Sequence, residues 1–245
     1  MRYLCVVAYD GFDYYGYQKQ NHEAKTIQQT IQEALKKLAK EDITIYASGR
    51  TDRQVHALGQ TFHFDTNLNI SNEAILKGMN SFLPNNIIIK SVKKIKEDFH
   101  ARFNVKRKQY VYKIKNSIQI NPFDVRYYAY IKETIDVDCL KAVAQLFIGT
   151  HNFKNFTTNK EQEVLSFEKT IYKVQIKQRK EEIEILFEGS GFLRYMVRMM
   201  VGAMLVVATN KKDISYVQNL LNLKSKEKCS YKASPQGLYL KKVIY

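Results

Sequence analysis

Hydrophobic and polar positions in the first hundred residues follow two different periods. Residues 2 to 9 form an apolar run typical of a strand, and residues 26 to 40 carry apolar side chains at helical spacing behind Thr26, the expected N-cap. The same criteria predict strands at residues 43 to 48, 60 to 65 and 86 to 95, and a helix at residues 72 to 83. The order strand, helix, strand, strand, helix, strand is that of a ferredoxin-like unit.

The second half of the chain repeats this pattern. Residues 109 to 115 predict a strand in which Tyr112 alternates with lysines, so we expect the ring of Tyr112 in the core. The other predicted elements are helices at residues 136 to 148, 190 to 208 and 213 to 222, and strands at residues 170 to 177, 181 to 188 and 237 to 244. The pattern therefore predicts an α+β fold of two similar halves, residues 1 to 105 and residues 106 to 245.

The charge of the chain narrows the classes of partner. Lysine and arginine number 39 against 24 acidic residues, a formal net charge of +15 over 245 residues. Such a charge indicates a polyanionic partner, either nucleic acid or an anionic membrane, although a solubilising surface is the simpler alternative. The most apolar segment, residues 191 to 208, contains Arg194 and Arg198, which disfavours a membrane-spanning helix.

Cysteine and histidine spacing gives no sign of disulfides or a metal site. The cysteines are scattered and form no CxxC pair, which is typical of a reducing compartment. The histidines show no metal-ligand spacing with one another or with cysteine. The residues concerned are Cys5, Cys139, Cys229, His22, His56, His63, His100 and His151. We expect a soluble cytoplasmic protein without a metal.

The densest positive charge lies in residues 93 to 115, where nine of the side chains are lysine or arginine and two are acidic. Aromatic rings are interleaved with these charges, which favours single-stranded or loop RNA over a regular duplex. The alternative is that the rings belong to the core face of the strand, as we expect for Tyr112; for Tyr110 both possibilities stay open. Lys106, Arg107 and Lys108 are the candidate phosphate contacts.

The segment ASGRTDRQVHALGQ, residues 47 to 60, places Asp52 in a basic loop between two glycines. This carboxylate has three possible roles. It could neutralise Arg50 or Arg53, it could cap a turn, or it could be a catalytic group held ionised by a guanidinium. The loop by itself does not decide between these roles.

Five segments in order along the chain resemble the motifs of the tRNA pseudouridine synthase A family. SGRTDRQVHALGQ resembles that family's GRTD-x-x-VHA signature, which contains Asp52. The other segments that resemble its motifs are YDGFDYYGYQKQ at 9 to 20, FHARFNVKRKQYVYKI at 99 to 114, GFLRYMVRMMVG at 191 to 202 and SPQGLYLKKVIY at 234 to 245.

The resemblance implies a fold and a role for each landmark. It implies two ferredoxin-like halves whose sheets join across a central active-site cleft, and a homodimer that grips the anticodon arm and elbow of tRNA. It implies conversion of uridine to pseudouridine at tRNA positions 38, 39 and 40, with no cofactor. The family's catalytic aspartate matches Asp52, its arginine partner Arg198, its active-site tyrosine Tyr110 and its loop arginine Arg50.

Several positions depart from the family pattern, although none removes a landmark. Gln54 stands where the family usually has glycine, and Tyr17 stands where tryptophan is common. Two alternatives therefore stay open: a paralogue that modifies ribosomal RNA, and a module of the same fold that binds RNA without catalysing a reaction. The retention of Asp52, Tyr110 and Arg198 argues against the second.

Overall fold

The computed structural model describes residues 1–20, 25–224 and 228–245 and has an α+β fold, as predicted. His22 lies outside the described residues. The chain divides into two compact units, Met1–Lys106 with Tyr239–Tyr245, and Arg107–Leu238. The last strand of the sequence therefore belongs largely to the first unit. No helix in the described part of the chain is long and apolar enough to cross a bilayer.

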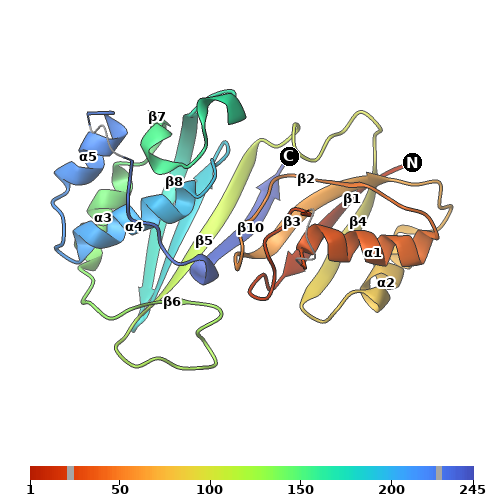
Figure 1. Ribbon diagram of the computed structural model, residues 1–245, viewed down its shortest axis with the longest axis horizontal. Coiled ribbons are helices and arrows are strands. Elements are labelled where there is room, and N and C mark those ends of the chain that lie inside the picture. Colours follow the sequence, from red (N-terminus) through yellow and green to blue (C-terminus); the bar gives the residue numbers. More distant parts are fainter. Residues whose placement is uncertain (21–24, 225–227) are drawn as a thin grey trace. The chain divides into compact units, whose positions relative to one another are not determined.

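The first unit contains the predicted ferredoxin-like order of elements. β1 (Arg2–Tyr9) lies between β4 (Ile87–Ile95) and β3 (His56–Asp65), antiparallel to both. The far edge of β3 pairs with β2 (Ile45–Ala47) near one end and with β10 (Leu238–Ile244) at the other, through Tyr239 and Leu240. Helices α1 (Ile27–Ala39) and α2 (Asn72–Phe82) pack against each other, and α2 contacts β4 (Figure 1).

Local sequence explains these elements. Alternate residues of β1 are buried, as the apolar pattern predicts. In α1 the buried Ile27, Ile31 and Leu35 recur every four residues and form one face. Thr26 is the N-cap, as predicted: its side chain accepts a hydrogen bond from the amide of Gln29.

The second unit has a sheet in the order β5, β9, β8, β7. β5 (Arg107–Asn116) pairs antiparallel with β9 (Glu182–Gly189), β9 with β8 (Glu168–Arg179), and β8 with β7 (Gly149–Asn152). β6 (Ala129–Ile131) adds to β5 in parallel. Helix α3 (Val137–Gln145) contacts α4 (Met196–Ala208) and β8, and α5 (Ser215–Leu221) follows α4 along the chain (Figure 1).

Two predicted boundaries differ from the structure by four residues or more. β3 begins at His56 and not at residue 60, because the polar side chains of His56 and Gln60 are buried in it and hide the expected alternation. The helix predicted at residues 190 to 208 begins at Met196, since Tyr195 has the left-handed φ of 62° and ends the preceding irregular segment. Arg194 therefore lies outside the helix, and Arg198 lies inside it.

Helix α4 is buried on every side, which is why no amphipathic pattern marks it. Gly202 lets the segment around Tyr231 approach the helix: a Cβ at this position would lie 2.5 Å from the carbonyl oxygen of Tyr231. Arg198 is the one charged residue of α4 and is 7% exposed. The helix thus carries a single guanidinium into an apolar environment.

Candidate active site

The loop from Ser48 to Val55 leaves β2 and enters β3, and it carries Asp52 at its centre. The carboxylate is half-buried, whereas Arg50 is exposed. The carbonyl of Asp52 accepts a hydrogen bond of 3.2 Å from the amide of Val55, which closes a turn. Within that turn Gln54 has a φ of 65°, so the residue at the family's glycine position keeps a left-handed backbone.

The first half of this loop is fixed by Gln60, whose side chain is fully buried. Its Oε1 accepts hydrogen bonds from the hydroxyl of Ser48 at 2.5 Å and from the amide of Thr61 at 3.0 Å. Its Nε2 donates to the carbonyl of Gly49 at 2.9 Å. Loss of this amide would leave buried polar atoms unpaired, so Gln60 ties the start of the loop to β3.

The centre of the loop is held by the segment that follows β1. The hydroxyls of Thr51 and Tyr9 lie 2.8 Å apart in a buried contact, and the carbonyl of Thr51 accepts from the amide of Tyr17 at 3.0 Å. Gly16 has a φ of 90°, and a Cβ there would lie 3.0 Å from the carbonyl oxygen of Thr51. The motif at residues 9 to 20 therefore supports the backbone beside Asp52.

The end of the loop packs against Gly11. A Cβ at this glycine would lie 2.0 Å from the carbonyl oxygen of Val55, so no side chain fits. The amide of Gly11 donates to Nδ1 of the buried His56 at 3.1 Å. Three separate contacts, at its start, centre and end, thus hold the loop in one conformation.

The two arginines that flank Asp52 differ in their contacts. The guanidinium of Arg53 lies over the ring of Tyr15, 4.3 Å from its centroid. Arg50 makes no hydrogen bond or ion pair with the residues that the structure describes. An exposed guanidinium without a protein partner is able to contact an anionic ligand.

In the second unit, Arg198 fixes the backbone near residue 233. Its Nε donates to the carbonyl of Ala233 at 2.8 Å, and its own carbonyl accepts from the amide of Ala233 at 3.0 Å. The neighbouring carbonyl of Ser234 accepts from the hydroxyl of Tyr112 at 2.8 Å. Arg198 is buried, and the predicted core position of Tyr112 is confirmed; burial raises the pKa of its phenol.

Cations surround Tyr195, the residue just before α4. The charged ends of Lys232, Arg194 and Arg198 lie 4.4, 5.0 and 5.4 Å from the centroid of its ring. The hydroxyl of Tyr195 also accepts a hydrogen bond from Arg194 at 3.3 Å. Sequence reasoning missed this cluster, because Lys232 is far from the helix along the chain.

Tyr110 lies on β5 opposite Phe187 of β9 and is half-buried. Its ring meets Phe192 edge to face, with centroids 5.1 Å apart. Tyr110 is therefore more exposed than Tyr112, and it lies three residues inside β5 because the strand begins at Arg107 and not at residue 109.

The candidate phosphate contacts are not equivalent. Lys106 is exposed, and Lys108 is half-buried. Arg107 lies 2.9 Å from the carboxylate of Glu188 and stacks over Tyr172 at 4.6 Å. Hydrogen bonds from Gln109 and Arg107 lower the pKa of Glu188, so the charge of Arg107 is partly compensated.

Among residues 1–20, 25–224 and 228–245, no group of three or more histidine, cysteine, aspartate or glutamate side chains is arranged to hold a metal ion.

The family profile and the similar proteins all point to one family. The sequence profile described as tRNA pseudouridine synthase matches residues 5–104 and 143–245. A tRNA pseudouridine synthase A of Staphylococcus epidermidis is 40% identical over 99% of this chain and 90% of its own length. Proteins of the same name from Exiguobacterium and Leuconostoc mesenteroides are 38% and 33% identical over 100% of this chain, and over 98% and 99% of their own lengths.

One solved structure, of a Cbf5–Nop10–Gar1 complex, contains a chain similar to 95% of this chain. The match covers 56% of that chain, with a TM-score of 0.36 and 9% identity. A likeness of this size carries no argument about the site.

The left-handed residue in the loop that carries Asp52 gives a stability prediction. A non-glycine residue in this region costs roughly 1–2 kcal/mol, and glycine loses roughly 0.5–1 kcal/mol more backbone entropy on folding. Gln54→Gly should therefore raise the free energy of unfolding by up to about 1 kcal/mol, or about 2–4 °C in Tm for a chain of this size. Gln54→Val, which is β-branched, should lower it. Thermal unfolding of the three proteins checks this, and a lower Tm for Gln54→Gly would show that the glutamine side chain itself stabilises the loop.

Proposed function

We propose that this chain, which belongs to the tRNA pseudouridine synthase family, isomerises uridine to pseudouridine in the anticodon stem-loop of tRNA, at positions 38, 39 and 40. The observation that carries the proposal is Asp52 on a loop held at its start, centre and end by buried contacts. A carboxylate on a fixed loop is preorganised for chemistry, whereas a carboxylate that only neutralises nearby charge needs no such support.

The reaction needs a positioned carboxylate and no net oxidation or reduction. The bond between N1 and C1′ breaks, the uracil turns, and a bond forms between C5 and C1′. The proton on C5 is lost and N1 gains one, so the product is an isomer of the substrate. Asp52 could attack C1′, attack C6, or remove a proton from the ribose, and all three routes require its ionised form.

Arg198 is the proposed partner of Asp52. A buried guanidinium is costly unless it is paired, and in the family that this chain resembles the matching arginine is the partner of the catalytic aspartate. We propose that the Nη donors pair with Asp52 and keep it charged. In this account Arg198 positions the carboxylate of Asp52 and favours its ionised form.

Tyr110 and Arg50 complete the site in this proposal. A base cannot react while stacked within the stem, so the target uridine must leave the stack. The half-buried ring of Tyr110 would stack on the extracted uracil. The exposed Arg50 would fill the vacated space and contact phosphate.

We also propose the assembly and the surroundings in which the chain works. The net charge of +15 supports binding to the anticodon arm and elbow of tRNA, with Lys106, Arg107 and Lys108 among the phosphate contacts. By resemblance to its family the chain would act as a cytoplasmic homodimer, without a cofactor.

The role of the carboxylate is tested by Asp52→Asn, which is nearly isosteric and removes the charge. We expect tRNA affinity within about twofold of the unchanged protein and no detectable pseudouridine, because the amide is neither a nucleophile nor a base. The measurement pairs filter binding with pseudouridine mapping on one transcript. Asp42→Asn, an exposed carboxylate paired with Lys36, is the matched control and should keep full turnover. Substantial turnover by Asp52→Asn would refute the proposed mechanism.

The role of the basic segment is tested by the dependence of affinity on salt. Each lost phosphate contact should make the slope of log affinity against log salt shallower by roughly 0.7–0.9. Replacing Lys106 and Arg107 by Ala should change the slope by about one unit and no more than two, since Glu188 already compensates Arg107. Replacing Lys36 and Lys77, exposed lysines of α1 and α2, should leave it unchanged. An equal change in both double variants would mean that these charges act only through net charge.

A further inference from the structure

The turn formed by residues 99–104, which follows β4, is held rigidly although most of its side chains lie at the surface. Ala101 is fully buried at its centre. Its amide donates to Nδ1 of His63 at 3.1 Å, and its carbonyl accepts from the hydroxyl of Tyr245 at 2.8 Å. The Tyr245 hydroxyl also lies 2.5 Å from that of Thr61. The turn is thus bonded to both β3 and the residue that follows β10.

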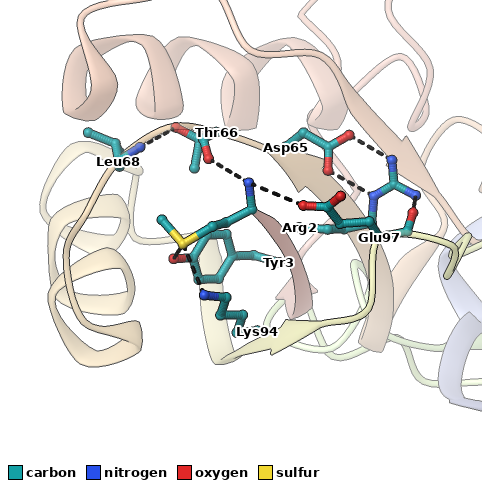
Figure 2. Close-up of polar contacts among 8 residues, drawn as sticks. Arg2, Tyr3, Asp65, Thr66, Leu68, Lys94 and Glu97 are labelled. Carbon is teal, nitrogen blue, oxygen red and sulfur yellow. Dashed lines mark hydrogen bonds and ion pairs between the residues drawn. The ribbon is translucent and has the colours of Figure 1, made fainter.

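Arg2 holds the beginning of the same turn. Figure 2 shows its guanidinium forming two parallel bonds with the carboxylate of Asp65, at 2.8 and 2.7 Å. Its Nη1 also donates to the backbone carbonyls of Glu97 and, at 2.9 Å, Phe99. The amino group of Met1, the residue before Arg2, donates to the carbonyl of Thr66 at 3.1 Å. One end of β1 therefore fixes the backbone leading into the turn.

Four rings lie against one another on the outer side of this turn. Tyr46 stacks on His63 with centroids 5.0 Å apart and planes 18° apart. His63 meets His100 edge-on at 4.7 Å, and His100 lies 4.4 Å from Phe103. Phe103 is 76% exposed and Tyr46 47% exposed. We refer to Tyr46, His100 and Phe103, with His63 beneath them, as the aromatic platform.

The base of the platform is uncharged at neutral pH. Desolvation, with smaller contributions from Arg2 and His100, lowers the pKa of His63 to about 4. Desolvation and the charges of Arg2 and Arg102 also lower the pKa of His100. Neutral imidazoles permit close ring stacking, and Nδ1 of His63 is free of a proton to accept the bond from Ala101.

Positive charge gathers beside the same turn. A hollow of about 560 Å³ is lined there by Lys93, Lys94 and Lys96, with Asp98 as the one acidic group. Phe99 and Asn104 of the turn complete its wall. Lys93 and Lys96 form no ion pair with any described residue. The guanidinium of Arg102 lies 5.8 Å from the ring of Phe103.

We infer that the aromatic platform stacks an unpaired nucleobase of the RNA substrate and that the lysine-lined hollow binds an adjoining phosphate. Exposed rings beside unpaired cations match a nucleotide, which has a flat π surface and an anionic backbone. The inference rests on the proposed function for the identity of the polyanion.

This nucleotide is distinct from the one that reacts. The loop of Asp52 enters β3 at His56, whereas the platform is built around His63 of the same strand. Seven residues of extended chain span roughly 23 Å. The platform would therefore contact a part of the RNA well separated from the target uridine, and it would contribute to affinity without taking part in the chemistry.

Removal of the exposed ring is the first test. A base stacked on an aromatic side chain contributes about 1–3 kcal/mol, so Phe103→Ala should weaken tRNA affinity roughly 5- to 150-fold. Single-turnover rates at saturating protein should stay unchanged. Phe82→Ala, at the end of α2 in the same unit and 43% exposed, is the matched control and should bind as the unchanged protein does. Equal affinities for Phe103→Ala and the unchanged protein would overturn the inference.

Direct contact is tested by fluorescence, because the chain contains no tryptophan. Phe103→Trp would place a single tryptophan on the platform, and a stacked base should quench its fluorescence. The tRNA concentration that gives half of the quenching should equal the concentration that gives half of the binding. Inorganic polyphosphate, which has charge but no bases, should not quench it, and neither probe should quench Phe82→Trp. Quenching by polyphosphate, or none by bound tRNA, would refute base stacking. If the unchanged protein forms no pseudouridine yet Phe103→Trp is quenched by RNA, the proposed function fails while the platform stands.

Discussion

The buried amide of Gln60 is the contact on which the geometry beside Asp52 depends. This side chain, on β3, forms hydrogen bonds with the hydroxyl of Ser48 and the carbonyl of Gly49. The start of a polar loop is thereby fixed to the sheet. The contacts of Thr51 with Tyr9 and Tyr17 add a second attachment from the segment after β1. The motifs at residues 9 to 20 and 47 to 60 therefore form one structural unit, which supports the proposal that Asp52 is preorganised for chemistry.

The positive φ of Gln54 is consistent with a loop that buried contacts hold in one conformation. The loop keeps a backbone that suits glycine even though glutamine occupies the position, because Gly11, Gly16 and Gln60 fix the backbone on either side. Strain that persists inside a well-supported loop is typical of functional sites. In the second unit, burial of the charge of Arg198 likewise costs free energy, and a hydrogen bond to the carbonyl of Ala233 holds its side chain in place.

Periodicity predicted most helices and strands, the N-cap at Thr26 and the burial of Tyr112, since each depends on neighbours in sequence. It failed for the start of β3, where buried His56 and Gln60 have partners that only the tertiary structure supplies. It failed for the start of α4, where Tyr195 adopts a left-handed backbone that a tyrosine does not lead one to expect. The proposed roles of Asp52, Arg50 and Tyr110 follow from resemblance, while the contacts that support the loop and the ring stack at His63 required the structure.

Pseudouridine mapping on a full-length tRNA transcript with uridines at positions 38, 39 and 40 tests the central claim most directly. The purified protein, in buffer containing a chelator and no added cofactor, should form pseudouridine at those positions and leave the other uridines unchanged. Modification confined to a ribosomal RNA fragment would move the activity to another substrate. Tight tRNA binding with no pseudouridine in any RNA would contradict the account and leave a module that binds RNA without catalysing its isomerisation.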